Sequence, residues 1–352
     1  MNVAGPYVSA LVREIKGWNL VRDSAAVDTI YFGGGTPSLL SLDQLEQILD
    51  AVYSQFEIAS DAEITIEMNP GDARSRHGHL DGWRRLGINR VSFGAQTFND
   101  ESLRQLGRTH SAEDIRQTFI ELRAAGFENI NFDLIAGLCG QSLADWQFNL
   151  DEALKLCPEH LSLYLLDVHE GTPLADQIKR GMRALPSEDV TAEMYRVMID
   201  EVCDAGYEHY EISNFCLPGH EAKHNSKYWT GAPYYGFGSS AHSYDGALRR
   251  WSNERDAARY TQLISADQSP VVENIELTAS DAQAESMYLG LRLMRGMDVR
   301  EFETRFGADP REKYQSDFER FTEAGLIEFD GNLIRLTRHG ALLSNEVFMA
   351  FV

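Results

Sequence analysis

Residues that can bind a polar ligand follow several short apolar stretches of the sequence. A glycine-rich run, Gly33 to Ser38, comes directly after Thr29–Phe32. Later apolar stretches contain, or end beside, four further polar side chains: Glu67, Gln96, Asp133 and Asp167. Glycines let a ligand approach the backbone closely, and carboxylates accept hydrogen bonds or pair with cations. The set predicts a binding site for a small polar ligand.

The glycine-rich run matches neither of the common nucleotide-binding motifs. It is not followed by the Gly-Lys-Ser/Thr of a phosphate-binding loop, and it lacks the third glycine of the dinucleotide fingerprint. Alone it would be read as a tight turn between a strand and a helix. Its place among several strand-end polar residues favours a role in binding.

The cysteines Cys139, Cys157, Cys203 and Cys216 are spread along the chain. No two are separated by the two or three residues that are typical of zinc or iron–sulfur ligands. The spacing predicts reduced, mostly buried thiols.

An apolar strand, a polar end and a helix recur between Asp28 and about Ser213. Strands are expected over Thr29–Phe32, Glu63–Glu67, Asn89–Phe93, Asn129–Ile135 and Leu161–Leu166. Capping pairs mark helix starts at Ser41 with Gln44, Ser111 with Asp114, and Ser142 with Asp145, and Gly87, Gly126 and Gly206 are placed to end helices. This alternation predicts a parallel sheet, either a barrel or an open doubly wound sheet. In a strand–helix barrel the carboxyl ends of the strands line one site, where the polar residues would converge.

The pattern changes after Ser213. Residues 215–245 are rich in Gly, Pro, Tyr and His, and helices are then expected over Asp256–Ile264, Ala279–Arg295 and Arg311–Ala324. Leu326–Phe329 and Leu333–Leu336 flank Asp330-Gly331, a strong hairpin signal, and a last helix starts near Thr337. Helices plus a hairpin resemble a winged helix, but the acidic residues around this hairpin argue against DNA reading.

The net charge of −22 argues against nucleic acid and anionic lipid as partners. Residues 1–12 lack the pattern of a signal peptide, and no apolar run reaches membrane-spanning length. We therefore expect a cytoplasmic protein without an integral membrane segment.

Five sequence blocks occur in the order of one known family. They are Tyr31-Phe-Gly-Gly-Gly-Thr-Pro-Ser38, Glu67-Met-Asn-Pro-Gly71, Arg90-Val-Ser-Phe-Gly-Ala-Gln-Thr-Phe98, Leu106-Gly-Arg-Thr-His110 and Asn131-Phe-Asp-Leu-Ile-Ala-Gly-Leu138. They resemble the radical S-adenosylmethionine (SAM) family that contains oxygen-independent coproporphyrinogen III oxidase and its haem chaperone relatives. The resemblance implies an α/β fold: a radical-SAM partial (β/α)6 TIM-like barrel over residues 1–215, without its first strand and cysteine loop. A smaller α+β C-terminal domain of helices plus a hairpin is expected over residues 216–352.

The resemblance also implies a SAM site, residue by residue. Gly34, Gly35 and Thr36 match positions that contact the amino-acid end of SAM, and Glu67, Gln96, Arg108 and Asp133 match further SAM contacts. The sequence departs from the family at Cys139, where proline is usual, and at Asp167–Glu170. These departures leave the detailed shape of the site undetermined, whereas the expected fold is unaffected.

The cysteine triad of the family is missing. The family holds three irons of a [4Fe–4S] cluster with a Cys-x3-Cys-x2-Cys loop, and Tyr7–Trp18 matches the helix that follows that loop. Although the family implies a cluster, no later cysteine group supplies its ligands here, so we do not expect radical catalysis. Either Met1 is a misassigned or internal start, which the survival of the SAM contacts favours, or the gene is degenerate.

His224-Asn-Ser-Lys-Tyr228-Trp229 resembles a segment typical of the haem chaperone branch. A histidine can ligate haem iron and aromatic rings can cover a porphyrin, so His224, Tyr228 and Trp229 are candidate haem contacts. His242 is a second candidate ligand. The preferred function is binding of haem and SAM for haem delivery to a recipient protein. A decarboxylating, SAM-dependent coproporphyrinogen III oxidase and an inactive scaffold without a cluster remain as alternatives.

Overall fold

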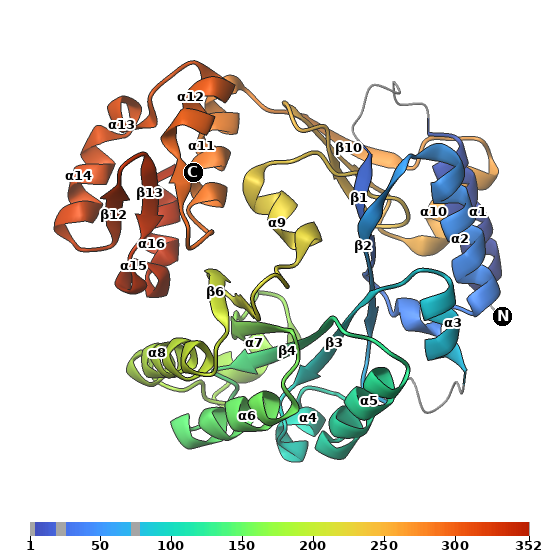
Figure 1. Cartoon of the computed structure of the whole chain (residues 1–352), viewed down its shortest axis with the longest axis horizontal. Helices are drawn as coiled ribbons and strands as arrows, with labels where there is room; N and C mark the ends of the chain where they lie inside the picture. The colour runs from blue at the N-terminus through green and yellow to red at the C-terminus, as the bar shows by residue number, and fades with distance from the viewer. Residues whose placement is uncertain (1–3, 19–25, 72–77, 352) are drawn as a thin grey trace. The chain divides into compact units, whose positions relative to one another are not determined.

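The largest sheet has the strand order β1-β2-β3-β4-β5-β7-β6 (Figure 1). The structure is a computed structural model that describes residues 4–18, 26–71 and 78–351. Its strands are β1 (Val27–Phe32), β2 (Ile58–Met68), β3 (Arg90–Gln96), β4 (Ile130–Ala136), β5 (His160–Leu165), β6 (Glu208–Glu211) and β7 (Asn214–Cys216). Strands β2 to β5 pair in parallel, and β7 is antiparallel to both β5 and β6. The five predicted strands are confirmed.

Helices alternate with these strands. They are α1 (Ala4–Lys16), α2 (Leu42–Gln55), α3 (His79–Arg85), α4 (Asp100–Gln105), α5 (Ala112–Ala124), α6 (Leu143–Leu156), α7 (Pro173–Lys179) and α8 (Glu188–Asp204), with a short 3-10 helix η1 (Pro37–Leu39). Figure 1 shows α4, α5, α6 and α8 along the outer side of β3 and β4. The buried ring of Phe132 lies 4.5 Å from that of Phe93 and 5.4 Å from that of Phe119 in α5, measured between centroids. This curved sheet with outer helices confirms the predicted partial barrel.

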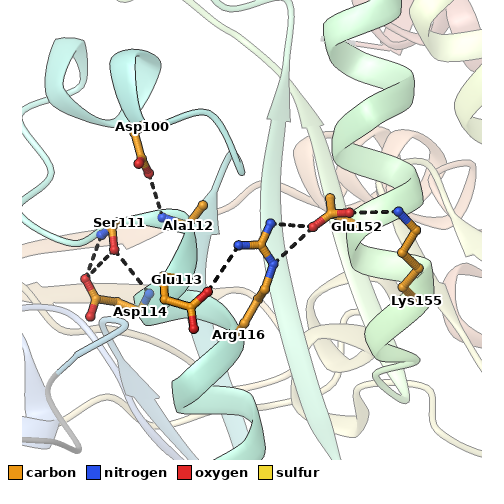
Figure 2. Close-up of polar contacts among 8 residues, drawn as sticks. All are labelled: Asp100, Ser111, Ala112, Glu113, Asp114, Arg116, Glu152 and Lys155. Carbon is orange, nitrogen blue, oxygen red and sulfur yellow. Dashed lines mark hydrogen bonds and ion pairs between the residues drawn. The ribbon is translucent and has the colours of Figure 1, made fainter.

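The predicted capping pairs form as expected. In α2, α5 and α6 the side chain of the N-cap serine accepts a backbone N–H, and the residue three positions later bonds back to the serine N–H. Figure 2 shows the pair Ser111 and Asp114 at the start of α5, beside an ion-pair chain in which Arg116 contacts Glu152 of α6. The ion pair joins α5 to α6, and the cap defines where α5 begins.

The chain forms two compact units. One contains residues 31–39 and 64–222, and the other contains residues 1–30, 40–63 and 223–352. The second unit holds α9 (Lys223–Thr230), β8 (His242–Tyr244), β9 (Arg249–Asn253), α10 (Ala257–Ser265), β10 (Val271–Glu276), α11 (Ala279–Gly290), β11 (Met297–Asp298), α12 (Val299–Phe306), α13 (Pro310–Lys313), α14 (Gln315–Glu323), β12 (Ile327–Asp330), β13 (Leu333–Leu336), α15 (Arg338–Leu342), α16 (Ser344–Phe348) and η2 (Met349–Phe351). The predicted domain boundary after residue 215 stays a prediction.

Some predictions for the C-terminal part need correction. The helix expected over Arg311–Ala324 is two helices, because Tyr314 has φ −112° and ψ 26° and separates α13 from α14. The helix expected to reach Arg295 ends at Gly290, where the chain turns back and a Cβ would lie 3.1 Å from that of Met297. The hairpin and the helix after Thr337 are confirmed. Within the described residues, no helix is long and apolar enough to cross a membrane.

Candidate functional site

Strands β2 to β5 alternate between apolar residues and polar ones. The polar set is Thr65 and Glu67 of β2, Arg90 and Ser92 of β3, Asn131 and Asp133 of β4, and His160 and Ser162 of β5. The strand register places Glu67 beside Ser92, Ser92 beside Asn131, and Asp133 beside Ser162. Parallel strands covered on both faces are usually apolar throughout, so this polar face indicates a ligand site.

Glu67 is held by the glycine-rich turn. The Tyr31 hydroxyl donates to Oε1 at 2.7 Å, and the Gly34 N–H donates to Oε2 at 3.1 Å. A Cβ at Gly33 would lie 2.5 Å from Cε1 of Tyr31, so only glycine fits there. Gly34 has a φ of +76°, which favours glycine, and the space beside both Gly34 and Gly35 is open. The turn therefore brings two predicted SAM glycines next to Glu67 and leaves space beside their Cα atoms for a ligand.

Asp133 lies on the same polar face and is a half-buried residue. Nδ2 of Asn131 donates to its Oδ1 at 2.9 Å. Burial raises the pKa of Asp133 to about 6, hydrogen bonds from Asn131 and Ser162 oppose that rise, and the negative charge of Glu67 adds to it. Two interacting carboxyl groups beside an open glycine turn suit a ligand that carries ammonium and hydroxyl groups.

Gln96 is the last residue of β3, and Thr36 and Arg108 lie in the segments that follow β1 and α4. Gln96 has a φ of +65°, which for a residue other than glycine costs about 1–3 kcal/mol and is frequent at functional sites. Its side chain folds over Gly94, where a Cβ would lie 2.5 Å from Nε2. Arg108 donates from Nη1 to Oδ1 of Asn69 at 3.2 Å, and Thr36 directly precedes η1. The SAM contacts of these three residues stay predictions.

The predicted haem segment forms helix α9. The carboxylate of the buried Glu63, in β2, accepts the backbone N–H groups of Lys223 and His224, each at 3.1 Å. Lys227 forms an ion pair with Asp28 at 2.6 Å. A carboxylate at a helix N-terminus satisfies amides that have no partner inside the helix, and it is favoured by the helix dipole. Helix α9 is thus fixed at its first turn and again at Lys227.

Both ring nitrogens of His224 have hydrogen-bond partners. Nδ1 lies 3.0 Å from Oγ1 of Thr29, and Nε2 lies 3.0 Å from the hydroxyl oxygen of Tyr228. The Tyr228 ring meets the Tyr234 ring edge-on, with centroids 4.7 Å apart. An imidazole ligates iron through one nitrogen, so one of the two contacts must open before His224 can bind haem iron.

Trp229 and His242 differ in their surroundings. The guanidinium carbon of Arg292 lies 4.2 Å from the centroid of the Trp229 ring. The indole Nε1 is buried without a hydrogen-bond partner among the described residues. His242, in β8, is exposed. The structure brings His224 and Tyr228 together, while the haem contacts of all four residues stay predictions.

Comparison with known proteins identifies the family of the chain. A model of the radical SAM superfamily matches residues 7–153, and one of the HemN C-terminal domain matches residues 277–343. Haem chaperone HemW of Bacillus subtilis is 36% identical over 98% of this chain and 91% of its own length, and HemW of Lactococcus lactis is 35% identical over 98% and 89%. The chain belongs to the HemW family. The structure of the radical SAM enzyme coproporphyrinogen III oxidase (HemN) from Escherichia coli has a TM-score of 0.84 and 26% identity, covering 99% of this chain and 83% of that one.

HemW family membership implies SAM and a [4Fe–4S] cluster, and the described residues fit only the first. The Glu67 and Asp133 carboxyl groups suit the ammonium and hydroxyl groups of SAM, and the space beside Gly34 and Gly35 is open to it. For a cluster, no three His, Cys, Asp or Glu side chains gather as a metal site in the part of the chain that the structure describes. We assign no step to a cluster here.

The cysteines correct one prediction. Cys157 and Cys203 are exposed, Cys139 is half-buried, and only Cys216 is buried, so the expectation of mostly buried thiols is wrong. Cys157 sits at the C-terminal cap of α6 with a left-handed φ of +53°, a place that faces solvent. Burial raises the pKa of Cys216 to about 12, which disfavours the thiolate that binds metals.

Sequence reasoning missed Tyr31, Glu63, Asn131 and His160 as parts of these sites. The period-two alternation in Asn131-Phe-Asp-Leu and His160-Leu-Ser-Leu was the available signal, because alternate strand residues share a face. The partners of Glu63 lie 160 and 161 residues away along the chain, at a separation that no local pattern reveals.

Proposed function

We propose that this chain is a haem chaperone that binds haem at α9, binds SAM at the polar face of the large sheet, and delivers haem to a recipient protein. The observation that carries the proposal is its similarity, along nearly all of its length, to proteins named haem chaperones. The geometry of α9 adds to it, since a histidine and two aromatic residues are presented on a helix anchored by Glu63.

Haem binding is proposed to use Nε2 of His224. If Nδ1–H of His224 donates to Oγ1 of Thr29, Nε2 carries the lone pair that an iron ligand needs. The Tyr228 hydroxyl then donates to Nε2 in the free protein and must turn away when haem arrives. Most of the affinity would come from burying the apolar macrocycle, and the axial bond would strengthen binding and fix the position of haem.

SAM binding is proposed to use Gly34, Gly35, Glu67 and Asp133. Glu67 is already oriented by Tyr31 and Gly34, so little ordering is needed on binding. SAM supplies a sulfonium centre and an amino-acid group when bound. The residues of this chain orient it and neutralise its positive charge.

Haem and porphyrinogen assays on the same preparation separate the three candidate functions. Binding of haem with a Soret band distinct from that of free haem supports the chaperone. Decarboxylation of coproporphyrinogen III under reducing conditions would instead support the oxidase, which the fold of HemN makes the second candidate. Failure of both assays would leave an inactive scaffold.

A further inference from the structure

A chain of buried hydrogen bonds ends on the Asp133 carboxyl group. Oδ1 of Asn131 lies 2.6 Å from Nδ1 of His160, and Nε2 of that ring lies 2.7 Å from the hydroxyl oxygen of Tyr210. The N–H of Ala222 donates to the same hydroxyl oxygen at 3.4 Å. With the bond from Asn131 to Asp133, five residues are connected in series.

The direction of these bonds follows from the carboxylate at one end. An ionised carboxyl only accepts hydrogen bonds, so the Nδ2 side of the Asn131 amide must face Asp133. The Oδ1 side then faces His160, which must donate from Nδ1–H and keep Nε2 as an acceptor. The hydroxyl of Tyr210 therefore donates to Nε2. Each donor in the series points toward Asp133.

Asp133 is the least buried member of the series. His160 is 0% exposed, Asn131 2% and Tyr210 7%, while Asp133 is half-buried. A buried polar network of this kind rigidifies its members when every group is satisfied. Asp133 is therefore the member of the series at which this rigidity can act on a ligand.

Other charged and titratable groups also act on Asp133. They are Tyr31 of β1, Glu67 of β2 and Arg90 of β3, and Ser162 of β5 adds a hydroxyl. Glu67 opposes ionisation of Asp133, and Arg90 favours it. Burial and the charge of Arg90 lower the pKa of His160, so its ring stays neutral and can serve as both donor and acceptor.

We propose that Asn131, His160 and Tyr210 are positioning residues that fix the orientation of the Asp133 carboxylate toward its ligand. The identity of that ligand as SAM rests on the proposed function, whereas the series of hydrogen bonds does not. The two claims can therefore fail separately.

The first test is the tautomer of His160. Long-range 1H–15N NMR at pH 8, with the signal assigned by its loss in His160→Asn, should show a neutral ring protonated on Nδ1. A ring protonated on Nε2, or a charged ring, would overturn the proposed direction whatever the protein binds. In Tyr210→Phe the acceptor role of Nε2 is no longer fixed, so a mixture of tautomers is expected.

The second test is the ionisation of Asp133, followed through its 13Cγ signal and assigned with Asp133→Asn. Asn131→Leu removes the donor, so the titration midpoint should rise by about one pH unit or more, because hydrogen bonds to charged groups are strong. Ser92→Ala is the matched control: it removes the other acceptor of Asn131 Nδ2, 2.8 Å away, and should move the midpoint far less. Equal midpoints in wild type and Asn131→Leu would overturn the proposal.

Calorimetry with SAM completes the test. Asn131→Leu should lower SAM affinity about tenfold or more at pH 8, and Tyr210→Phe should lower it less. If the NMR results hold but wild type does not bind SAM, the proposed SAM site fails and the positioning role stands. If Asn131→Leu does not fold, the His160 tautomer in wild type and in Tyr210→Phe decides the question.

Discussion

Nε2 of His224 lies 3.0 Å from the hydroxyl oxygen of Tyr228, one turn further along α9. The hydroxyl therefore occupies the nitrogen that we propose for haem iron. Tyr228→Phe removes this competing hydrogen bond while keeping the ring, so haem affinity should rise. A hydrogen bond contributes about 0.5–1.5 kcal/mol, which corresponds to an increase of roughly two- to twelvefold. Absorbance titration with haem measures it.

Tyr234→Phe is the control for that change. Its ring packs against Tyr228, but it lies outside the pair formed by His224 and Tyr228. Its haem affinity should stay near that of wild type. Weaker haem binding by Tyr228→Phe than by Tyr234→Phe would mean that the Tyr228 hydroxyl assists binding.

Glu63 anchors α9, and its loss should destabilise the protein. Glu63→Ala leaves the N–H groups of Lys223 and His224 without their acceptor, and the loss of a side-chain cap at a helix N-terminus costs about 0.5–2 kcal/mol. Urea unfolding should show this loss, and hydrogen exchange should quicken at those two amides. The exposed Glu57→Ala should change the free energy of unfolding by less than about 0.5 kcal/mol. Equal unfolding midpoints for the two variants would rule out this anchoring role.

The raised pKa of Asp133 predicts a pH-dependent stability. The folded protein binds the proton of Asp133 more tightly than the unfolded chain, whose aspartate has a pKa near 3.8. Asp133 thus destabilises the fold progressively as the pH rises from about 4 through about 6. Asp133→Asn should therefore be more stable than wild type at pH 8, by about 1–3 kcal/mol, and not at pH 4. Thermal unfolding at both pH values measures this difference in stability, with the exposed Asp167→Asn as control. An equal gain in stability of Asp133→Asn at pH 4 and pH 8 would contradict the predicted pH dependence.

The sequence indicated the large sheet well because each strand is an apolar run of strand length followed by a capped helix. It did not indicate the polar face as a unit. Asn131 and His160 become neighbours only through the register between β4 and β5, and tertiary pairing sets that register. The small sheet of β8, β9 and β10 was also missed. Most side chains of β10 are exposed, so this strand carries no alternation of apolar and polar residues.

SAM affinity should depend on the orientation of Glu67 as well as on its charge. Glu67→Ala removes the carboxylate and should weaken SAM binding most. Tyr31→Phe removes one hydrogen bond to Oε1 and should weaken it less. Calorimetry at pH 8 measures both. Undiminished affinity in Glu67→Ala would show that SAM does not bind at this turn.

The dispersed cysteines predict that this chain holds no [4Fe–4S] cluster. Anaerobic reconstitution with iron and sulfide should leave substoichiometric, loosely bound iron, because no group of ligands is present among the described residues. Near-stoichiometric iron and sulfide with a cubane absorption spectrum would contradict this.

Titration of the folded protein with haem tests the central claim most directly. Wild type should give a Soret band distinct from that of free haem, and His224→Ala should shift that band and weaken binding without abolishing it, since burial of the macrocycle remains. The exposed His339→Ala, outside the candidate haem residues, should match wild type. A wild-type spectrum indistinguishable from that of free haem would contradict the chaperone function. An unchanged spectrum and affinity in His224→Ala would contradict the assignment of the ligand.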